Sequence, residues 1–335
     1  MYRAKRRRCR DACRAEMESP GIGVFWRVSR QRCSGRVGMR VGWVGLGAMG
    51  APMARRLAAE GHEVVAYDLM PAARRAAQQA GGITVAGSAG EAASGVVALF
   101  VMVATPDQAR DVLVGEAGAL ARLDPGTAVV VTATIGPAAM EDLARQISAA
   151  GAVAVDAPVS GGTARAEVGE LLMMAGADPA ALARVRPALD ALASRLTVVG
   201  PSPGDGQRMK LVNQLLCGVH IAAAAEALAF AEAIGLNPEQ CWETVRQGAA
   251  MSFMLEDRGR RMLAGDFDDV RSAVDIFTKD MGLVTDAAAE LRQPAPLAQQ
   301  AGNLFQRASA AGLGRQDDSS VIRLYHQERG QPPAP

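Results

Sequence analysis

The stretch Arg40-Val-Gly-Trp-Val-Gly-Leu-Gly-Ala-Met-Gly50 decides the fold of this chain. Its apolar run ends in three glycines, an alanine-rich helical stretch follows to Glu60, and a second apolar run, Glu63–Tyr67, stops at Asp68. A strand, a G-x-G-x-x-G turn, a helix, a strand and an acid in this order form the dinucleotide-binding fingerprint. They predict an α/β protein with a Rossmann-type, doubly wound parallel sheet. A structural glycine turn in another α/β protein is the alternative.

Each part of this fingerprint has a physical role. Gly45 permits the tight turn, Gly47 lets the backbone approach a pyrophosphate, and Gly50 lets the helix pack closely, so that its N-terminal N–H groups face the phosphates. Asp68 lies 23 residues after Gly45, where a carboxylate accepts hydrogen bonds from the ribose hydroxyls and repels a 2′-phosphate. The turn therefore predicts NAD rather than NADP. The cofactor contacts expected in the same turn include Leu46, Ala48 and Met49.

A length of 335 residues allows two domains, each with its own core. Short apolar runs alternate with helical stretches to about Gly200, and only helical patterns follow the breaker Pro201-Ser-Pro-Gly204. We expect a NAD-binding domain over 39–203, an all-α domain over 204–326 and a tail over 327–335. The predicted strands are Arg40–Val44, Glu63–Tyr67, Val96–Val103, Ala128–Val131, Ala152–Asp156, Leu171–Ala175 and Leu196–Val199, and the clearest helices are Ala138–Ala150, Pro179–Leu192 and Gly206–Ile234.

The first 38 residues differ from the rest, with eleven Lys/Arg against three acids. Because Met39 directly precedes the first strand, we expect residues 1–38 to be an extension without a fold, and an arginine-rich transit peptide is the alternative. The remaining chain has 25 basic and 32 acidic residues, which gives no reason to expect nucleic-acid binding. Cys9 and Cys13 lack the neighbours of a metal site, and we expect no metal. Cys217 and Cys241 fall in helical patterns, and the absence of a disulfide pattern favours the cytoplasm.

Two apolar stretches deserve comparison with membrane spans. Val96–Ala104 is far too short for a bilayer and predicts a buried parallel strand. Leu215–Ile234 is longer, but it contains His220, Glu226 and Glu232 and is mostly alanine. We expect it to be a core helix, and we expect no membrane association.

Two further stretches carry chemistry. Ser160, Gly161 and Gly162 follow the predicted strand that ends at Asp156, where ligands bind in open α/β sheets, and their N–H groups and one hydroxyl suit a carboxylate. An ordinary strand-to-helix turn fits that pattern equally well.

Lys210, Asn213, Gln214 and Cys217 share one face of the long predicted helix. Partial burial there would lower the lysine pKa toward the range of a general acid/base, and a solvated helix face is the alternative. Spacing alone predicts that Lys279-Asp280 is a surface ion pair.

These four stretches occur in the order and approximate spacing of the β-hydroxyacid dehydrogenases, which the chain resembles over about residues 39–325. The resemblance implies an active site between a Rossmann domain and an all-α domain, with Lys210 as catalytic lysine and Asn213 as its amide partner. It also implies that Ser160–Gly162 bind the substrate carboxylate. The further cofactor contacts that it implies are Val103, Ala104, Gln108, Thr134 and Lys279.

Two places depart from the family pattern. Val131 and Ala133 stand where the family often has an acid and a serine, and Gln214 stands where a second asparagine is common. We therefore expect substrate contacts at these places to differ. The stretches Asn213–Glu226, Ser272–Leu283 and Asp317–Ile322 are most similar to the L-threonate dehydrogenase branch. The 3-hydroxyisobutyrate dehydrogenases and tartronate semialdehyde reductases share the same machinery and are the alternatives.

The resemblance implies NAD-dependent oxidation of a short hydroxy acid, in which Lys210 removes the hydroxyl proton. Two other interpretations are a dinucleotide-binding module without turnover and an imine reductase. The presence of Lys210 disfavours both. The expected partners are a small hydroxy acid and a second copy of the chain in a dimer or tetramer. The alanine-rich stretch over 222–231 permits close helix packing between copies, and packing within one chain would use it equally well.

Overall fold

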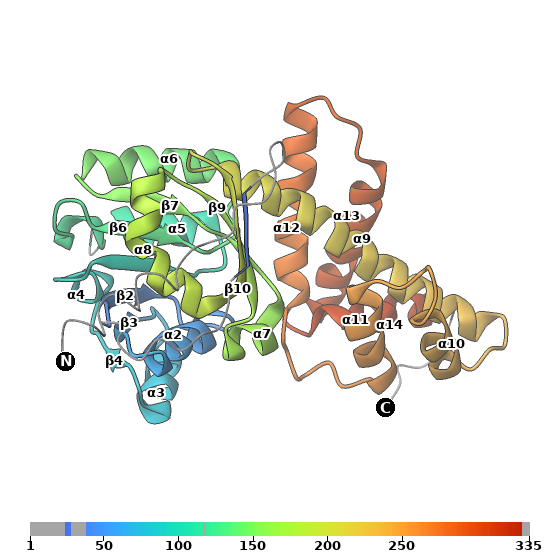
Figure 1. Cartoon of the computed structure of the whole chain (residues 1–335). Helices are drawn as coiled ribbons and strands as arrows, with labels where there is room; N and C mark the ends of the chain where they lie inside the picture. Colours follow the sequence, from blue (N-terminus) through green and yellow to red (C-terminus); the bar gives the residue numbers. More distant parts are fainter. Residues whose placement is uncertain (1–23, 28–37, 117, 330–335) are drawn as a thin grey trace, which may run out of the picture. The chain divides into compact units, whose positions relative to one another are not determined.

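The computed structural model describes residues 24–27 (backbone only), 38–116 and 118–329 (Figure 1). The chain forms two compact units, which divide between Met209 and Lys210, inside the long helix α9 (Asp205–Ala233). Most of the amino-terminal extension, including Cys9 and Cys13, and the last residues of the tail lie outside the described residues.

The first unit is built on one sheet in the order β1-β10-β9-β7-β6-β5-β2-β3-β4. Six neighbouring strands of this sheet, β7, β6, β5, β2, β3 and β4, all run parallel to one another. β2 and β5 are neighbours at the centre of this parallel part. This is the strand order of a doubly wound dinucleotide-binding fold, so the predicted fold class is confirmed. The bounds of these strands are β2 (Arg40–Val44), β3 (Glu63–Tyr67), β4 (Thr84–Val85), β5 (Ala98–Val101), β6 (Ala128–Val131) and β7 (Val153–Asp156).

The remaining strands depart from the predicted parallel order. β9 (Leu171–Gly176) and β10 (Ala193–Gly200) are parallel to each other, but β9 is antiparallel to β7. The expectation that both continue the parallel sheet is therefore wrong. The short strand β8 (Val159–Ser160) turns back on β9 through helix α7 (Gly162–Val168), so the chain reverses direction without a long crossover.

One edge strand of this sheet lies in the amino-terminal extension. Residues Val24–Arg27 form β1, which pairs antiparallel with β10 in the register Val24 to Val198. At these four residues the structure differs from the expectation of an extension without a fold, because an open sheet edge offers unpaired backbone groups to any extended segment.

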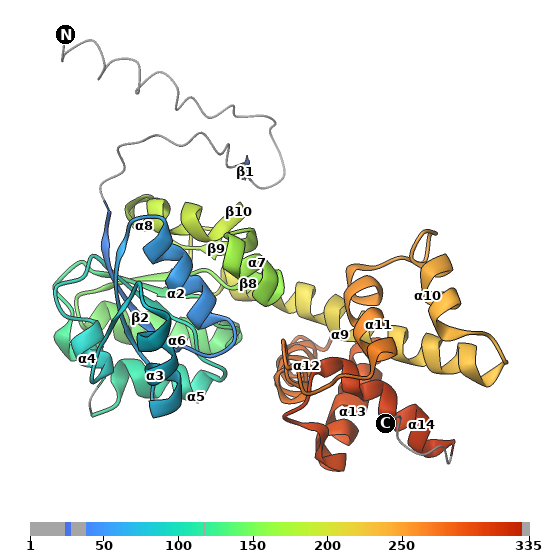
Figure 2. The same cartoon turned by 90° about the horizontal axis from the view of Figure 1, so that it is seen from below.

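Both faces of the sheet are buried by helices (Figure 2). Trp43 and Phe100 point to the face covered by α2, α7 and α8, and their rings stack with centroids 5.3 Å apart. Leu99 and Val101 point to the opposite face, covered by α5 and α6. Burial on both sides explains why these strands are continuous apolar runs. The helices of this unit are α2 (Gly50–Ala59), α3 (Pro71–Ala80), α4 (Ala89–Ala92), α5 (Pro106–Val114), η1 (Leu120–Arg122), α6 (Pro137–Ala149) and α8 (Pro179–Leu192).

The second unit is helical, as predicted. Between Lys210 and Arg329 the only β pairing is an isolated bridge between Ala273 and Asp317. The rings of Phe277 and Phe305 stack in its core with centroids 5.2 Å apart. The helices after α9 are α10 (Pro238–Val245), α11 (Phe253–Ala264), α12 (Val274–Glu290), α13 (Pro296–Ala308), η2 (Ser309–Leu313), η3 (Asp318–Val321) and α14 (Ile322–Glu328).

Helix α9 alone, among the residues that the structure describes, is long and apolar enough to cross a membrane by length and composition. Its most apolar 18-residue window has a mean hydropathy of 1.5, and 44% of that window is buried inside the protein. Ile221, Ala225 and Leu228 lie in the core of the second unit. The burial of this face agrees with the predicted core helix.

Candidate active site

The glycine turn between β2 and α2 has the geometry that a dinucleotide requires. Gly45 has a φ of 98°, and a Cβ on Gly45 would lie 2.0 Å from the Met102 carbonyl oxygen. A Cβ on Gly50 would lie 2.0 Å from the Gly45 carbonyl oxygen. Gly47 is exposed, with open space where its side chain would be. Side chains are thus excluded at the turn itself, while the backbone at Gly47 stays open to a ligand.

The N-terminus of α2 is also suited to an anion. No side chain caps it, and no acid lies in its first turn. The helix dipole and the unpaired N–H groups at this end therefore favour a phosphate. The residues present at this turn fit the pyrophosphate of NAD, including Leu46, Ala48 and Met49, which form the turn with the glycines.

Asp68 ties the end of β3 to the glycine turn. Its Oδ2 accepts a hydrogen bond of 2.6 Å from the Leu46 N–H, and its Oδ1 accepts one of 2.7 Å from the Met70 N–H. Arg74 Nη1 donates to the Asp68 carbonyl oxygen at 2.6 Å. The carboxylate is thus fixed beside the turn, where each oxygen retains a lone pair for a ribose hydroxyl.

The loop after β5 forms the next part of this edge. A Cβ on Gly45 would lie 3.2 Å from Val103 Cγ1, so this loop touches the glycine turn. The Ala104 N–H donates to Gln108 Oε1 at 2.9 Å, and the Gln108 N–H donates to Thr105 Oγ1 at 3.2 Å. Gln108 therefore holds the backbone of Ala104, which is a role that spacing could not predict.

The loop after β6 carries Thr134 and is held by Gln207, a residue that the sequence did not indicate. Gln207 Oε1 accepts from the N–H groups of Ile135 and Gly136 at 3.0 and 3.1 Å. Gln207 Nε2 donates to the Ala133 carbonyl oxygen and to Asp156 Oδ1 at 3.0 and 2.8 Å. The side chain is fully buried, so the first turn of α9 fixes the backbone on both sides of Thr134.

Asp156 completes this buried network. Its Oδ2 accepts from the N–H groups of Gly204 and Gln207 at 2.9 and 3.0 Å. Burial raises the pKa of Asp156 to about 6, against the opposing effect of the Gln207 hydrogen bonds and of the backbone donors. The acid at the end of β7 therefore anchors the start of α9.

The predicted carboxylate-binding turn lies just beyond this anchor. Ser160 ends the short strand β8, opposite Leu172, and α7 begins at Gly162. Gly161 and Gly162 have φ values of 140° and 73°, which side chains rarely adopt. Because β2, β3, β5, β6 and β7 are parallel, this turn, the glycine turn, Asp68 and Thr134 all follow the carboxyl ends of strands at one edge of the sheet.

In the second unit, the structure groups the polar residues of α9 with two residues of α12. Asn213 Nδ2 donates to Gln214 Oε1 at 2.8 Å and to Cys217 Sγ at 3.4 Å. Gln214 Nε2 donates to Asp280 Oδ2. Lys279 Nζ lies 2.7 Å from Asp280 Oδ1. The Asp280 side chain is only 3% exposed, so the expectation of a surface ion pair at Lys279-Asp280 is wrong.

Lys210 is buried beside this group, with 6% of its surface exposed. Burial lowers its pKa, the negative charge of Asp280 opposes this, and the positive charge of Lys279 adds to it. Burial also raises the pKa of the Cys217 thiol. A buried amine with a lowered pKa suits proton transfer near neutral pH. The histidines offer no substitute at this place. His326 pairs with Glu232, His62 accepts from the Met39 N–H, and His220 lies ten residues after Lys210 on α9, about 15 Å along the helix.

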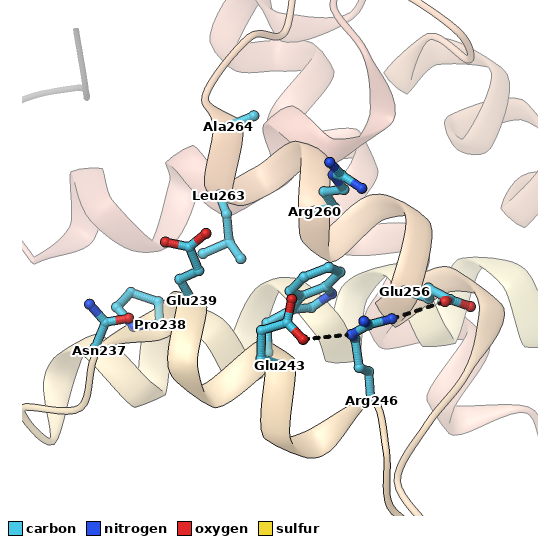
Figure 3. Close-up of a pocket in the computed structure, with 10 residues that line it drawn as sticks. Asn237, Pro238, Glu239, Glu243, Arg246, Glu256, Arg260, Leu263 and Ala264 are labelled. Atoms are coloured by element: carbon cyan, nitrogen blue, oxygen red, sulfur yellow. Dashed lines mark hydrogen bonds and ion pairs between the residues drawn. The ribbon is translucent and has the colours of Figure 1, made fainter.

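A separate pocket of about 560 Å³ lies between α10 and α11 (Figure 3). Arg246 lines this pocket and forms ion pairs with Glu243 at 3.1 Å and Glu256 at 3.2 Å. The Arg246 guanidinium lies 4.7 Å from the Trp242 ring centroid. None of the site residues indicated by the sequence lines this pocket. It is distinct from the Lys210 group.

Comparison with known proteins gives consistent matches along the chain. The NAD-binding domain of 6-phosphogluconate dehydrogenase matches residues 40–200, and the NAD-binding domain of NADP-dependent 3-hydroxyisobutyrate dehydrogenase matches residues 204–325. An L-threonate dehydrogenase of Escherichia coli is 41% identical over 285 residues, which are 85% of this chain and 94% of that protein.

Two further relatives carry other names. A 2-hydroxy-3-oxopropionate reductase of Escherichia coli is 33% identical over 285 residues, covering 85% of this chain and 96% of that protein. The crystal structure of a 3-hydroxyisobutyrate dehydrogenase from Salmonella typhimurium matches with a TM-score of 0.80 and 43% identity, covering 85% of this chain and 99% of that chain.

Proposed function

The chain belongs to the β-hydroxyacid dehydrogenase family and is a NAD-dependent hydroxy acid dehydrogenase, and we propose that it oxidises L-threonate to 2-dehydro-L-erythronate. The observation that carries the choice of substrate is the 41% identity to an L-threonate dehydrogenase over nearly the whole of both chains. The relatives named 2-hydroxy-3-oxopropionate reductase and 3-hydroxyisobutyrate dehydrogenase make those reactions the second candidate.

The proposed chemistry assigns a role to each group of residues. The backbone N–H groups and hydroxyl of Ser160–Gly162 bind the substrate carboxylate. Lys210 Nζ, whose pKa is lowered by burial, takes the proton from the hydroxyl that is oxidised. Bound NAD supplies the acceptor for the hydride, and Gly45–Gly50, Asp68, Val103, Ala104, Gln108, Thr134 and Lys279 are the residues proposed to hold it.

The substrate is tested by initial rates with NAD and a panel of hydroxy acids. L-threonate should give a kcat/KM at least about tenfold above 3-hydroxyisobutyrate and glycerate, since one well-placed hydrogen bond to a substrate hydroxyl is worth about that factor. A higher kcat/KM for either of the other acids would replace the proposed substrate. Absence of turnover with every acid would favour a dinucleotide-binding module without catalysis.

The role of Lys210 is tested by Lys210→Ala. The variant should lose about 10²–10⁴-fold in kcat, the usual worth of a positioned acid/base, with nearly unchanged NAD affinity. Arg208→Ala is the matched control, because Arg208 lies two residues earlier on α9 and its exposed side chain pairs with Glu141 and Asp205. Near-normal turnover of the Lys210 variant would overturn the mechanism, and loss of NAD binding would make Lys210 a cofactor anchor.

We further propose that the enzyme is a cytoplasmic homo-oligomer. Met209, Val212 and Leu216 are 41%, 58% and 49% exposed and lie on one side of α9, as an interface between copies requires. Cys217 and Cys241 are free thiols, as expected in a reducing compartment. Sedimentation equilibrium tests the assembly, and a monomer at micromolar concentration would contradict it.

A further inference from the structure

The two neighbouring amides of α9 form a hydrogen-bonded chain that ends on a carboxylate of α12. Asn213 donates to Gln214, Gln214 donates to Asp280, and Lys279 lies beside the other oxygen of that carboxylate. Gln214 and Asp280 are both buried, with 6% and 2% of their surfaces exposed. Water therefore has little access to the middle of the chain of hydrogen bonds.

Asp280 determines which group donates and which accepts in each of these hydrogen bonds. A carboxylate only accepts hydrogen bonds, and the other oxygen of Asp280 forms an ion pair with Lys279 at 2.7 Å. Gln214 must therefore turn its NH₂ group toward Asp280. Its carbonyl oxygen, Oε1, then faces Asn213 and can only accept.

The orientation of Asn213 follows from that of Gln214. Its NH₂ group must face Gln214 Oε1, which it does at 2.8 Å, and its second N–H points to Cys217 Sγ at 3.4 Å. Both donors of Asn213 are thus engaged. Its Oδ1 accepts no hydrogen bond from the residues for which side chains are described, and Asn213 is only partly buried.

We propose that Asp280 and Gln214 are positioning residues, which hold Asn213 so that its Oδ1 accepts a hydrogen bond from the Lys210 amine and turns the lone pair of that amine toward the reacting hydroxyl. The proposal rests on the proposed function, because it concerns the hydroxyl whose proton passes to Lys210. Asn213 lies three residues after Lys210 on α9, so the two side chains share a face. Before proton transfer Oδ1 accepts from an N–H of the neutral Lys210 amine, and the substrate O–H donates to the lone pair of Lys210 Nζ. After the transfer Oδ1 accepts from an N–H of the Lys210 ammonium.

Two substitutions separate orientation from charge. Gln214→Met removes both amide contacts at similar side-chain length and leaves all charges in place. We expect kcat to fall about tenfold, the worth of one hydrogen bond that is no longer oriented, with unchanged NAD affinity and an unmoved acid limb of the pH profile of kcat. Asp280→Asn offers Gln214 a partner that can donate or accept, so a similar fall is expected.

The pH profile distinguishes Asp280 from a merely structural residue. The negative charge of Asp280 raises the pKa of Lys210 against the effect of burial. Asp280→Asn should therefore move the acid limb of kcat to lower pH, because Lys210 loses its proton more readily. At a pH above the acid limb of every variant, the double variant should be no slower than the slower single variant, since there both changes act through the same amide of Asn213.

The control is Gln299→Met, the same substitution at an exposed position of α13, which should leave kcat unchanged. Gln214→Asn keeps an amide and should recover part of the lost kcat. The proposal would be overturned if Gln214→Met had a normal kcat. It would also be overturned if the loss of kcat in the double variant equalled the product of the losses in the two single variants. The proposal would also be overturned if Asp280→Asn lowered kcat equally at every pH, left the acid limb in place and lowered the melting temperature. The assays use whichever hydroxy acid is turned over best, so an error in the substrate leaves this test valid, and failure of the proposed mechanism appears separately in Lys210→Ala.

Discussion

Replacing Asp68 by serine should convert the preference for NAD into a preference for NADP. In the structure the carboxylate is fixed at the end of β3 by the N–H groups of Leu46 and Met70. Arg74 remains close to the same place, because its Nη1 donates to the Asp68 carbonyl oxygen at 2.6 Å and its guanidinium lies 5.4 Å from the Tyr67 ring centroid. The substitution removes a negative charge and leaves a positive one.

The magnitude follows from two contributions. Loss of a charge-assisted hydrogen bond to the ribose costs about 1.5–3 kcal/mol, which lowers kcat/KM for NAD at least about tenfold. A 2′-phosphate carries a charge of about −1.5 to −2, and unit charges about 4 Å apart repel by about 1 kcal/mol in water and about 4 kcal/mol near a protein surface. Relief of this repulsion raises kcat/KM for NADP by about tenfold or more. The Leu46 contact is lost for both cofactors and cancels, so the ratio should shift about a hundredfold.

The assay measures kcat/KM with both cofactors for the native enzyme, Asp68→Ser and the control Glu63→Ser. The control removes an acid from the other end of the same strand, where Glu63 is exposed and pairs with Arg40 at 3.6 Å. The native ratio should favour NAD at least about tenfold, and the control should keep that ratio. Equal use of NAD and NADP by the native enzyme, or a ratio that Asp68→Ser leaves unchanged, would refute the reasoning.

Three further outcomes concern stability. A chain that begins at Met39 should keep its turnover, but β10 loses its pairing with β1. If that pairing is worth about 1 kcal/mol, the melting temperature should fall by about 2–4 °C. A loss of turnover would contradict this prediction. For Asp156, a folded pKa of about 6 against 3.8 unfolded means that the folded state binds the extra proton. Stability should thus fall by up to about 3 kcal/mol as pH rises from about 4 to 6. The difference between native and Asp156→Asn urea unfolding curves across this range isolates the effect, and a flat difference would exclude it. Arg258→Met should cost about 3–5 kcal/mol, because it leaves the fully buried Asp318 without the guanidinium that donates to it at 3.0 and 3.1 Å. Arg307→Met, at an exposed pair with Glu328, should cost less than about 1 kcal/mol in the same urea assay, and equal costs would show that burial is not the cause.

Local sequence was sufficient for the dinucleotide-binding half of the first unit. The strands Arg40–Val44, Glu63–Tyr67 and Ala128–Val131 and the helix Pro179–Leu192 have the predicted bounds in the structure. The reason is that parallel strands buried on both faces are apolar throughout, and that the turn at Gly45 tolerates no side chain. Such requirements act within a few residues of one another, so they can be read from the chain directly.

The sequence carried weaker information where a strand depends on its neighbours. β4 and β8 have two residues each and exist only through their pairing with β3 and β9. The antiparallel direction of β9 depends on the path of the chain through β8 and α7, which apolar patterning does not specify. Gln207 offered no signal either, because its partners Ala133 and Asp156 are 74 and 51 residues away.

The sequence by itself determined the fold class, the glycine turn, the acid at Asp68 and the shared face of Lys210 and Asn213, since each is a matter of spacing along one strand or helix. The tertiary structure alone decided that Asp280 is buried and that it lies against Gln214, 66 residues away. Burial and pKa depend on which distant elements exclude water from a side chain, and no local pattern encodes that. A Lys-Asp pair that spacing assigns to the surface thus lies inside the second unit, beside the lysine proposed to move the proton.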